Sequence, residues 1–387
     1  MFNAHVCAIG RRGLLAAAAG LLLACAFPAS AQEPIKIGLV TALSGQSARA
    51  GEAITRGLTI AIDELNAKGG VLGRKLVLVR RDDEATPAKG VTAARELIFR
   101  EKVAVLFGGL DTPVSMAIVP IVNQEKVPFM GPWAAGTAIT KNGANPNFVF
   151  RVSAVDEIVN VAMLDYAQKH FSTKKPGLIL VNNPWGESNE KGLRAALGTK
   201  NVSAAGIEKF EANDVDVVPQ LTRLRQSGTD TLFLVGNVGP SAQVVKSLDR
   251  MGWKVPIVSH WGPAGGRFSE LAGPNAKEVH FVQTYSFFGK QSPVGEKVLE
   301  GTAELDSHAS ESSKVHASHS GGSAASPGLL SKLVDLLGRL RLGEVFPDVD
   351  LFHRQPGNSR EPHAPTNTSS LTERTPRRSV SFVAHRP

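Results

Sequence analysis

The chain has 387 residues, enough for two or three domains that each bury a sizeable core. Its net charge is +8, but basic and acidic residues are interspersed, as in residues 80–84, where two arginines directly precede three acids. Because no basic stripe is interleaved with aromatic residues, the composition favours a solvated surface and argues against a nucleic-acid-binding protein.

The first 31 residues predict a secretory signal peptide. Arg11 and Arg12 supply its positive charge, residues 14–27 form its apolar core, and residues 29–31, Ala-Ser-Ala, match a small-residue cleavage site. The apolar run is shorter than the roughly 20 residues that a membrane-spanning helix needs. We therefore expect an exported protein whose mature chain begins just after this site.

Two other export routes stay open. Arg11 and Arg12 also resemble a twin-arginine signal, and the four residues that end at Cys25, Leu-Leu-Ala-Cys, resemble a lipobox that would make Cys25 a lipidated N-terminus. The small-residue cleavage site favours a free periplasmic protein over a lipoprotein. Cys7 and Cys25 are the only cysteines of the chain, so the mature form would have neither a disulfide nor thiolate chemistry.

Apolar runs typical of buried strands alternate with helical patterns between residues 35 and 284. The expected strands cover residues 35–40, 76–79, 103–107, 127–130, 148–152, 177–181, 203–210, 231–235, 256–259 and 279–284. The expected helices cover residues 52–68, 88–100, 113–124, 158–168, 187–197, 217–226 and 241–251. Such alternation predicts an α/β fold in which parallel sheets carry helices on both faces.

Ten strands exceed what one compact doubly wound sheet usually carries, which predicts two doubly wound parallel-sheet lobes. Residues 32–152 would form lobe 1, and residues 153–290 would form lobe 2. The chain would cross between the lobes near residues 152–156 and 285–292, and these crossings would act as a hinge.

Residues 301–387 differ in composition from the rest of the chain. They are rich in Ser, Pro and Arg, and they contain neither Trp nor Tyr. This composition predicts a low-complexity tail, disordered or aberrant, because it cannot bury enough apolar surface to offset chain entropy. Residues 329–342 are the exception, since their leucines fit one amphipathic helix. A metal site at His308, His316 and His319 is disfavoured because no cysteine or packed scaffold would hold its geometry.

Several segments, in order along the chain, carry a family resemblance. They read IGLVTALSG, DELNAKGGVLGRKL, DDEATPAKG, LFGGLDTPVSMAIVPIVNQEKVPFMGPWAAGTAIT, FVFRVS and NNPWGESNEKGL. In these segments the chain resembles periplasmic solute-binding proteins of the branched-chain amino acid type, which serve ABC transporters. The resemblance covers most of the chain and fades after about residue 299. It implies a type I periplasmic binding fold, a small-molecule ligand, an ABC permease in the inner membrane as partner, and a monomer without a cofactor.

In this family the chain returns to lobe 1 after lobe 2 and then crosses once more. Residues 293–300 would begin the return to lobe 1, but none of the family's closing segments is recognisable in the tail. We therefore expect a fold that is incomplete at the C-terminus, through a frameshift or an aberrant end. Sequencing the gene would test this, since a shifted frame after about codon 300 should restore an α/β pattern.

Loops at the carboxyl ends of the strands should face the cleft, where open α/β sheets bind ligands. The first such loop holds Ser44 and Arg49, a hydroxyl and a guanidinium near a helix N-terminus that suits an anion. Alternatively, Ser44 only caps the helix and Arg49 is solvated. The next loop holds Thr112, which best matches the family's carboxylate-binding hydroxyl. A plain helix cap by Asp111 or Thr112 is compatible with that role.

Tryptophans mark two further loops. Trp133 is followed by Ala134 and Ala135, whose backbone N–H groups would meet a carboxylate, although Ala135 stands where the family has a threonine. Trp185 stands where the family usually has a tyrosine that closes over the ligand, and its indole face can do the same. Each tryptophan could equally be a core residue.

A third tryptophan, Trp261, occupies a place where amino-acid binders often have an acid that pairs with the ligand's ammonium group. With Arg49 and no acid at this place, the loops favour an apolar or aromatic carboxylate over a simple α-amino acid. Glu187 remains an alternative source of the missing negative charge.

These residues predict a solute receptor that closes over a small amino acid or an aromatic or aliphatic carboxylate and delivers it to an ABC permease. An enzyme is disfavoured because the chain has no G-x-S-x-G, Walker, G-x-G-x-x-G or H-E-x-x-H motif, and only His260 among its histidines is placed to face the cleft. Two alternatives stay open: a ligand-sensing domain of a regulator, and an inactive truncated binding protein.

Overall fold

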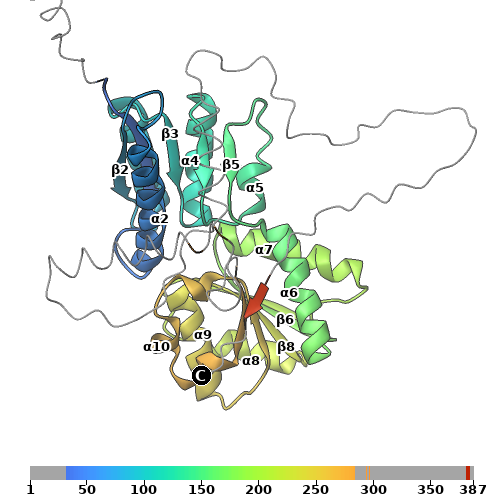
Figure 1. The fold of residues 1–387 in the computed structure, drawn as a ribbon. Helices are drawn as coiled ribbons and strands as arrows, with labels where there is room; N and C mark the ends of the chain where they lie inside the picture. The colour runs from blue at the N-terminus through green and yellow to red at the C-terminus, as the bar shows by residue number, and fades with distance from the viewer. Residues whose placement is uncertain (1–31, 284–292, 294–295, 297–380, 384–387) are drawn as a thin grey trace, which may run out of the picture.

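The computed structural model describes residues 32–283, 293, 296 and 381–383, which form two lobes, one above the other in Figure 1. Lobe 1 is built on a parallel sheet of five strands. Their spatial order is β2 (Leu76–Asp82), β1 (Ile35–Thr41), β3 (Val105–Gly108), β4 (Phe129–Gly131) and β5 (Val149–Arg151). The chain passes into lobe 2 directly after β5.

Lobe 2 repeats the same strand order. Its parallel strands are β7 (Gly206–Phe210), β6 (Pro176–Val181), β8 (Thr231–Val235), β9 (Ile257–Ser259) and β10 (Val279–Gln283). The short β11 (Ser381–Val383) pairs antiparallel with β10 at the sheet edge and is drawn red in Figure 1. The ten parallel strands match the ten expected runs and confirm the fold class of two doubly wound lobes.

Helices connect the strands in both lobes. Those of lobe 1 are α2 (Ala48–Ala67), α3 (Pro87–Arg95), the π-helical η1 (Glu96–Arg100), α4 (Thr112–Gln124) and α5 (Thr137–Thr140). Those of lobe 2 are α6 (Asp156–Phe171), α7 (Pro184–Thr199), α8 (Val218–Gln226), α9 (Val238–Arg250), η2 (Gly262–Gly265), α10 (Phe268–Ala272) and η3 (Pro274–Glu278). The seven longer helices lie where expected, whereas α5, α10 and the two 3-10 turns are too short to leave a periodic pattern.

The lobe 1 sheet is buried on both faces, which explains its near-continuous apolar strands. Because successive side chains of a strand point to opposite faces, Leu39 packs with α2 residues such as Leu58, while its neighbour Val40 packs toward α3 and α4. In both sheets the first strand lies between the second and the third. This order places the loops after the first and third strands at a switch point facing the other lobe.

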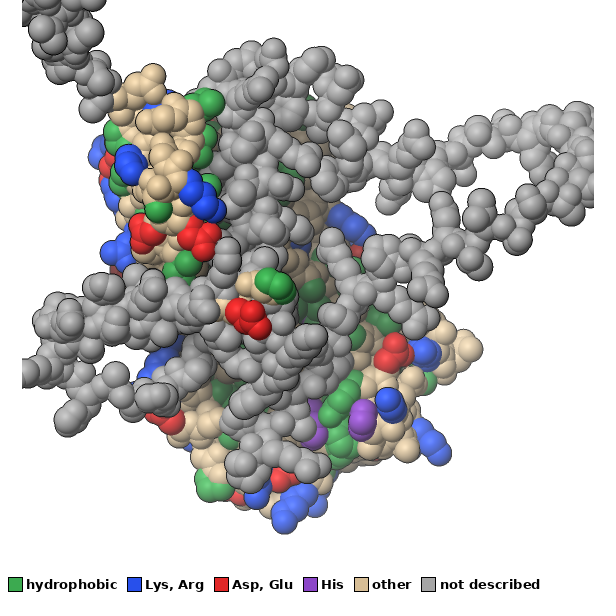
Figure 2. Space-filling model, viewed as in Figure 1, with side chains coloured by type: hydrophobic (Ala, Val, Ile, Leu, Met, Phe, Trp, Pro, Cys, Tyr) green, Lys and Arg blue, Asp and Glu red, His purple; other side chains and the backbone are tan. Residues whose placement is uncertain are grey.

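Several predictions fall outside the described residues. These are the signal peptide, the second crossing at residues 285–292, almost all of the return segment 293–300, and the histidines of the tail. Within the described part of the chain, no helix combines the length and apolarity that crossing a membrane requires. Figure 2 shows basic and acidic side chains intermixed on the visible described surface, in agreement with the interspersed charges of the sequence.

Candidate functional site

A small cavity lies between the two lobes at the carboxyl ends of both sheets. Its volume is about 10 Å³, room for about one water molecule, so a larger ligand requires the lobes or the side chains to move apart. Lobe 1 contributes Leu110, Asp111, Thr112, Trp133, Ala134 and Ala135, and lobe 2 contributes Trp185, Asn237 and Trp261. Six of the eight residues proposed from the sequence therefore line one cavity.

Thr112 lies on the lobe 1 side, at the first position of α4, and its side chain is buried. Its Oγ1 accepts a hydrogen bond from the backbone N–H of Gly136 at 3.1 Å, which ties the start of α4 to the loop after β4. The hydroxyl proton is left to donate elsewhere. The N-terminus of α4 adds N–H groups without intrahelical partners and a partial positive charge, so this corner of the cavity suits an anion.

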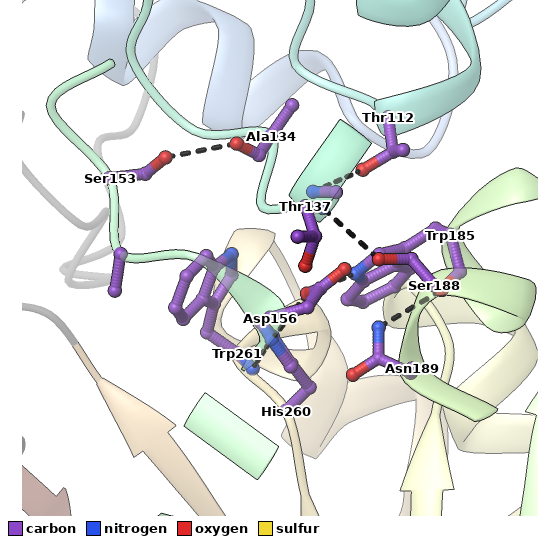
Figure 3. Close-up of polar contacts among 12 residues, drawn as sticks. Thr112, Ala134, Thr137, Ser153, Asp156, Trp185, Ser188, Asn189, His260 and Trp261 are labelled. Atoms are coloured by element: carbon purple, nitrogen blue, oxygen red, sulfur yellow. Dashed lines mark hydrogen bonds and ion pairs between the residues drawn. The ribbon is translucent and has the colours of Figure 1, made fainter. Parts of the chain in front are cut away.

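The loop after β4 is held from the hinge side through its carbonyls. Ser153 Oγ donates to the carbonyl of Ala134 at 2.9 Å (Figure 3). The N–H of Asp156 donates to the carbonyl of Ala135 at 2.9 Å. Because N–H and C=O of a trans peptide point in opposite directions, the N–H of Ala135 points away from the hinge. Within the described residues, the N–H groups of Ala134 and Ala135 form no hydrogen bond.

Arg151 also holds the loop after β4 through the carbonyl groups of that loop. Its guanidinium donates to the carbonyl of Gly136 at 2.6 Å and lies farther from those of Ala134 and Ala154, at 3.4 Å each. Burial lowers the pKa of Arg151 to about 10, opposed by the carboxylate of Asp156. The arginine therefore stays protonated at neutral pH and fixes the lobe 1 side of the hinge.

The three tryptophans meet across the lobe boundary. Trp133 packs against the cores of both lobes, and its ring centroid lies 6.5 Å from that of Trp261, at an interplanar angle of 75°. Trp185 is 6% exposed and Trp261 3%, so both are core residues of lobe 2 as well as cavity walls. A place in the core is therefore compatible with lining the cavity, and the aromatic edge-to-face contact between Trp133 and Trp261 joins the lobes.

Two residues of the cavity were missed from the sequence. Asp111 and Asn237 are paired across the lobes, with Asn237 Nδ2 donating to Asp111 Oδ1 at 2.7 Å. Burial raises the pKa of Asp111, opposed by this hydrogen bond. Both residues stand at helix N-cap positions, yet neither side chain caps its helix, because each side chain is directed to the other. In the sequence Asp111 is recognisable only as a helix cap, and a cap position does not reveal a hydrogen-bond partner 126 residues away.

Two further contacts hold the lobes together. The N–H of Thr137 in lobe 1 donates to Ser188 Oγ in lobe 2 at 3.1 Å. The side-chain amide of Gln46 lies against Gly239, whose missing side chain makes room for it: a Cβ built there would fall 1.7 Å from Gln46 Oε1. With the Asp111–Asn237 pair, these contacts describe a closed arrangement of the lobes.

The Asp111–Asn237 pair leads to a testable expectation about closure. Asn237→Ala should raise the equilibrium constant between the open and the closed arrangement of the ligand-free protein roughly fivefold to tenfold. The substitution removes a hydrogen bond of about 1 kcal/mol and leaves the Asp111 side chain without this partner. Small-angle X-ray scattering should then give a larger radius of gyration than for the unmodified protein.

Asn275→Ala is the matched control, because Asn275 Nδ2 donates to Asp249 Oδ1 at 2.6 Å entirely within lobe 2. Equal radii of gyration for the two variants would show that the pair between the lobes does not hold them closed.

Ser44 and Arg49 do not line the cavity. Ser44 is exposed, and its hydroxyl hydrogen-bonds to Asp82 at the end of β2. Arg49 lies in the first turn of α2. Gln46, which lies between them in the sequence, touches Gly239 of lobe 2.

Asp156 is a buried acid that the sequence analysis also overlooked. It is the first residue of α6 and is 0% exposed. Trp185 Nε1 donates to its Oδ1 at 3.2 Å, and His260 Nε2 lies 3.0 Å from the same oxygen, although not in hydrogen-bond geometry (Figure 3). His260 is fully buried, and its ring lies against that of Trp261. The prediction that His260 faces the cleft is therefore wrong.

The cavity is lined by hydrogen-bond donors and by aromatic rings. Within the described residues, no group of three His, Cys, Asp or Glu side chains could hold a metal ion. What the cavity offers is recognition: a helix N-terminus, a hydroxyl and free N–H groups on one side, and indole faces on the other.

Comparisons with known proteins agree with this arrangement. A family model described as periplasmic binding protein matches residues 34–296. Leu/Ile/Val-binding protein homolog 3 of Brucella melitensis biotype 1 is 24% identical over 256 residues, which cover 66% of this chain and 69% of the relative. Leu/Ile/Val-binding protein homolog 7 of Brucella suis biovar 1 is 29% identical over 262 residues, 66% of this chain and 64% of the relative.

Solved structures share the fold. The substrate-binding protein LivJ of Streptococcus pneumoniae, in complex with isoleucine, matches with a TM-score of 0.63 and 23% identity over 70% of this chain and 78% of its own. A solute-binding protein of an ABC transporter from R. palustris, in complex with 4-hydroxybenzoate, matches with a TM-score of 0.61 and 24% identity over 70% of this chain and 73% of its own.

The family model covers more than half of the chain, and the two-lobed fold and the cavity between the lobes agree with it. Relatives of this kind bind solutes and are not enzymes, and their family works outside the cytoplasm. The chain therefore belongs to the periplasmic binding protein family and has its type I fold.

Proposed function

We propose that this protein is a periplasmic receptor that closes its lobes over a small amino acid or an aromatic or aliphatic carboxylate and delivers it to an ABC permease. The observation that carries the proposal is the cavity between the lobes, walled by three tryptophans and a helix N-terminus. Because the cavity holds about one water molecule in the closed arrangement, loading requires opening, and closure then buries the ligand.

The carboxylate end of the ligand would bind at the lobe 1 corner. The Thr112 hydroxyl, the N-terminus of α4 and the N–H groups of Ala134 and Ala135 are donors on one side of the cavity. Several N–H donors converging on one carboxylate is the usual way in which uncharged groups stabilise an anion. This corner needs no arginine, and Arg49 does not line the cavity.

The other end of the ligand would lie between Trp133, Trp185 and Trp261. Flat indole faces suit an apolar or aromatic side chain. Asp111 adds a possibility that the sequence analysis did not include, since its carboxyl lines the cavity and could pair with an ammonium group. An α-amino acid would therefore use the Asp111 carboxylate as a partner for its ammonium group, whereas an aromatic acid without an ammonium group would not.

A binding panel tests the proposal. Leucine, isoleucine, valine and 4-hydroxybenzoate are titrated into the mature protein by isothermal titration calorimetry, with thermal melting in parallel. We expect at least one of them to bind and to raise the melting temperature. Trp133→Ala and Thr112→Val should each weaken that binding by about tenfold or more. If no amino acid or organic acid of an extended panel stabilises the protein, the receptor function is overturned, and the truncated, inactive form is favoured.

Asp111→Asn separates the two ligand classes. The amide keeps an oxygen that can accept from Asn237 but loses the negative charge. We expect Asp111→Asn to lower the affinity for an α-amino acid by roughly tenfold to a hundredfold, because the ligand's ammonium group loses its charged partner. The affinity for 4-hydroxybenzoate should change by no more than about threefold. Parallel calorimetric titrations check this, and equal losses for both ligands would show that Asp111 acts through closure alone.

Three parts of the proposal concern the whole molecule. The signal peptide would be removed after Ala31, the mature protein would be a monomer, and the permease would recognise the closed lobes. A sensing domain of a regulator would use the same cleft, and the described residues hold no further module that would favour this alternative.

A further inference from the structure

We propose that Asp156 is a positioning residue that holds three walls of the cavity between the lobes at once. This inference rests on the proposed function, because it assigns a role toward the ligand of that site. Asp156 itself does not line the cavity; it lies directly behind it, at the described crossing from lobe 1 to lobe 2.

The first wall is the loop of lobe 1. The backbone N–H of Asp156 donates to the carbonyl of Ala135 at 2.9 Å. This bond turns the carbonyl of Ala135 away from the cavity. The residue that starts the first helix of lobe 2 thus sets the orientation of a lobe 1 backbone segment that we assign to the ligand's carboxylate.

The second wall is Trp185. Its indole Nε1 donates to Asp156 Oδ1 at 3.2 Å, while its ring lines the cavity. An indole N–H is a donor with no acceptor capacity, and a buried tryptophan needs one partner to fix the ring in its pocket. Asp156 provides that partner, so the plane of the Trp185 wall depends on it.

The third wall is Trp261, reached through His260. The N–H of Trp261 donates to His260 Nδ1 at 3.0 Å, so Nδ1 is the acceptor and Nε2 is the ring nitrogen directed elsewhere. Nε2 lies 3.0 Å from Asp156 Oδ1 but outside hydrogen-bond geometry, so Asp156 reaches Trp261 through a close contact with the His260 ring. Figure 3 shows the carboxylate of Asp156 between Trp185 and the His260–Trp261 pair.

Packing alone does not require a carboxylate at this position. The side chain is 0% exposed, and its Oδ2 has no hydrogen-bond partner within the described residues. Burying such a group is costly, whereas an apolar side chain would fill the space without that cost. A role limited to starting α6 does not account for the acid, whereas its contacts with Trp185 and His260, together with the charge of the buried Arg151, do.

Asn160 provides a matched control, since it lies one turn later on the same face of α6. It is also 0% exposed, and neither of its side-chain polar atoms has a partner within the described residues. It packs against Gly192 of α7, away from the cavity. Asn160→Leu therefore makes the same kind of polar-to-apolar change without touching a cavity wall.

The experiment compares Asp156→Leu, Asp156→Asn and Asn160→Leu by calorimetric titration with whichever of leucine, isoleucine, valine or 4-hydroxybenzoate binds the unmodified protein most tightly. We expect Asp156→Leu to lower affinity at least tenfold and Asn160→Leu to stay within about twofold. Asp156→Asn keeps an acceptor oxygen for the Trp185 indole and should recover affinity to within about threefold. Similar losses for the two leucine variants, or no recovery by asparagine, would overturn the positioning role.

A ligand-free readout keeps the inference separate from the proposed function. The tryptophan emission maximum of Asp156→Leu should shift relative to Asn160→Leu, and the shift should disappear in a Trp185→Phe background. If the unmodified protein binds no ligand of the panel but this shift is present, the proposed function fails while the contact with Trp185 stands. If the shift is absent, the positioning inference fails.

Discussion

Replacing Gly186 with alanine is expected to lower the unfolding free energy of the protein by about 3 kcal/mol or more. Gly186 lies in the first turn of α7, directly after Trp185. A Cβ built on it would fall 1.8 Å from the carbonyl oxygen of Val181, the last residue of β6. Because that oxygen belongs to the backbone of a buried strand, it cannot move aside as a side chain would.

This close approach sets the position of Trp185. Asn183 accepts hydrogen bonds from the N–H groups of Trp185 and Gly186, so the chain turns sharply from strand to helix and aims the indole at the cavity. Any backbone shift that accommodates an alanine at 186 would move Trp185 as well. We therefore expect ligand binding to weaken together with stability.

Gly198→Ala is the control within the same helix. It is exposed, and a Cβ there would meet nothing within 4 Å, so alanine should leave stability unchanged or raise it by up to about 1 kcal/mol. Thermal melting should show a loss of roughly 6–12 °C for Gly186→Ala and none for Gly198→Ala. Equal melting temperatures for the two variants would mean that α7 can slide away from β6 at little cost.

The fold was predictable because its signals are local and repeated. Each buried parallel strand is a short apolar run, and each long helix shows apolar residues three or four apart. Elements of four or five residues, such as α5 and α10, were not predicted because little more than one helical turn cannot show a repeated apolar spacing. The pairing of the strands into two sheets of equal order follows from the number of runs and from the family resemblance.

Two kinds of signal predicted residues of the candidate site: the tryptophans are unusual in their own loops, whereas Thr112, Ala134 and Ala135 stand at places that the family resemblance marks. Trp133, Trp185 and Trp261 stand out in any loop, and all three line the cavity. Asp111 does not stand out, because an aspartate before a helix is the commonest cap. Its actual partner is Asn237, on another lobe.

Asp156 was missed for a related reason. An acid at the start of a helix is favoured by the helix dipole and attracts no further interpretation. Its roles depend on Trp185 and His260, which folding brings beside it from 29 and 104 residues further along the chain. Single-residue signals cannot show a contact that requires the tertiary fold.

Stability should fall as the pH rises from about 4 to 7, because of Asp83 at the end of β2. Burial raises the pKa of this carboxyl from 3.8 to about 7, opposed by a hydrogen bond from the N–H of Ala85 and assisted by the charges of Asp111 and Asp82. Between these pH values the folded state holds a proton that the unfolded state has lost, so the unfolding free energy falls as the pH rises and levels off above about 7. The full interval corresponds to about 4 kcal/mol at 1.36 kcal/mol per pH unit.

Asp83→Asn should flatten this pH dependence and raise the unfolding free energy at pH 8 by about 1–2 kcal/mol. The amide keeps the oxygen that accepts from the N–H of Ala85 at 2.8 Å, and it cannot ionise. Its NH2 group takes the place of Oδ2, which has no partner within the described residues, and this limits the gain. Urea unfolding at several pH values measures the effect. Some slope should remain, since burial raises the pKa of Asp111 in the same direction.

The neighbouring Asp82→Asn should have the opposite effect. Burial opposes the ionisation of Asp82, but hydrogen bonds from the Ser44 hydroxyl and from backbone N–H groups, including those of Glu84 and Leu43, lower its pKa. Its ionised form therefore stabilises the folded state above pH 4, and the asparagine variant should be less stable at pH 8. Two adjacent aspartates with opposite responses would separate the buried carboxyl from a general effect of net charge. Parallel losses of stability in both variants would contradict a raised pKa of Asp83.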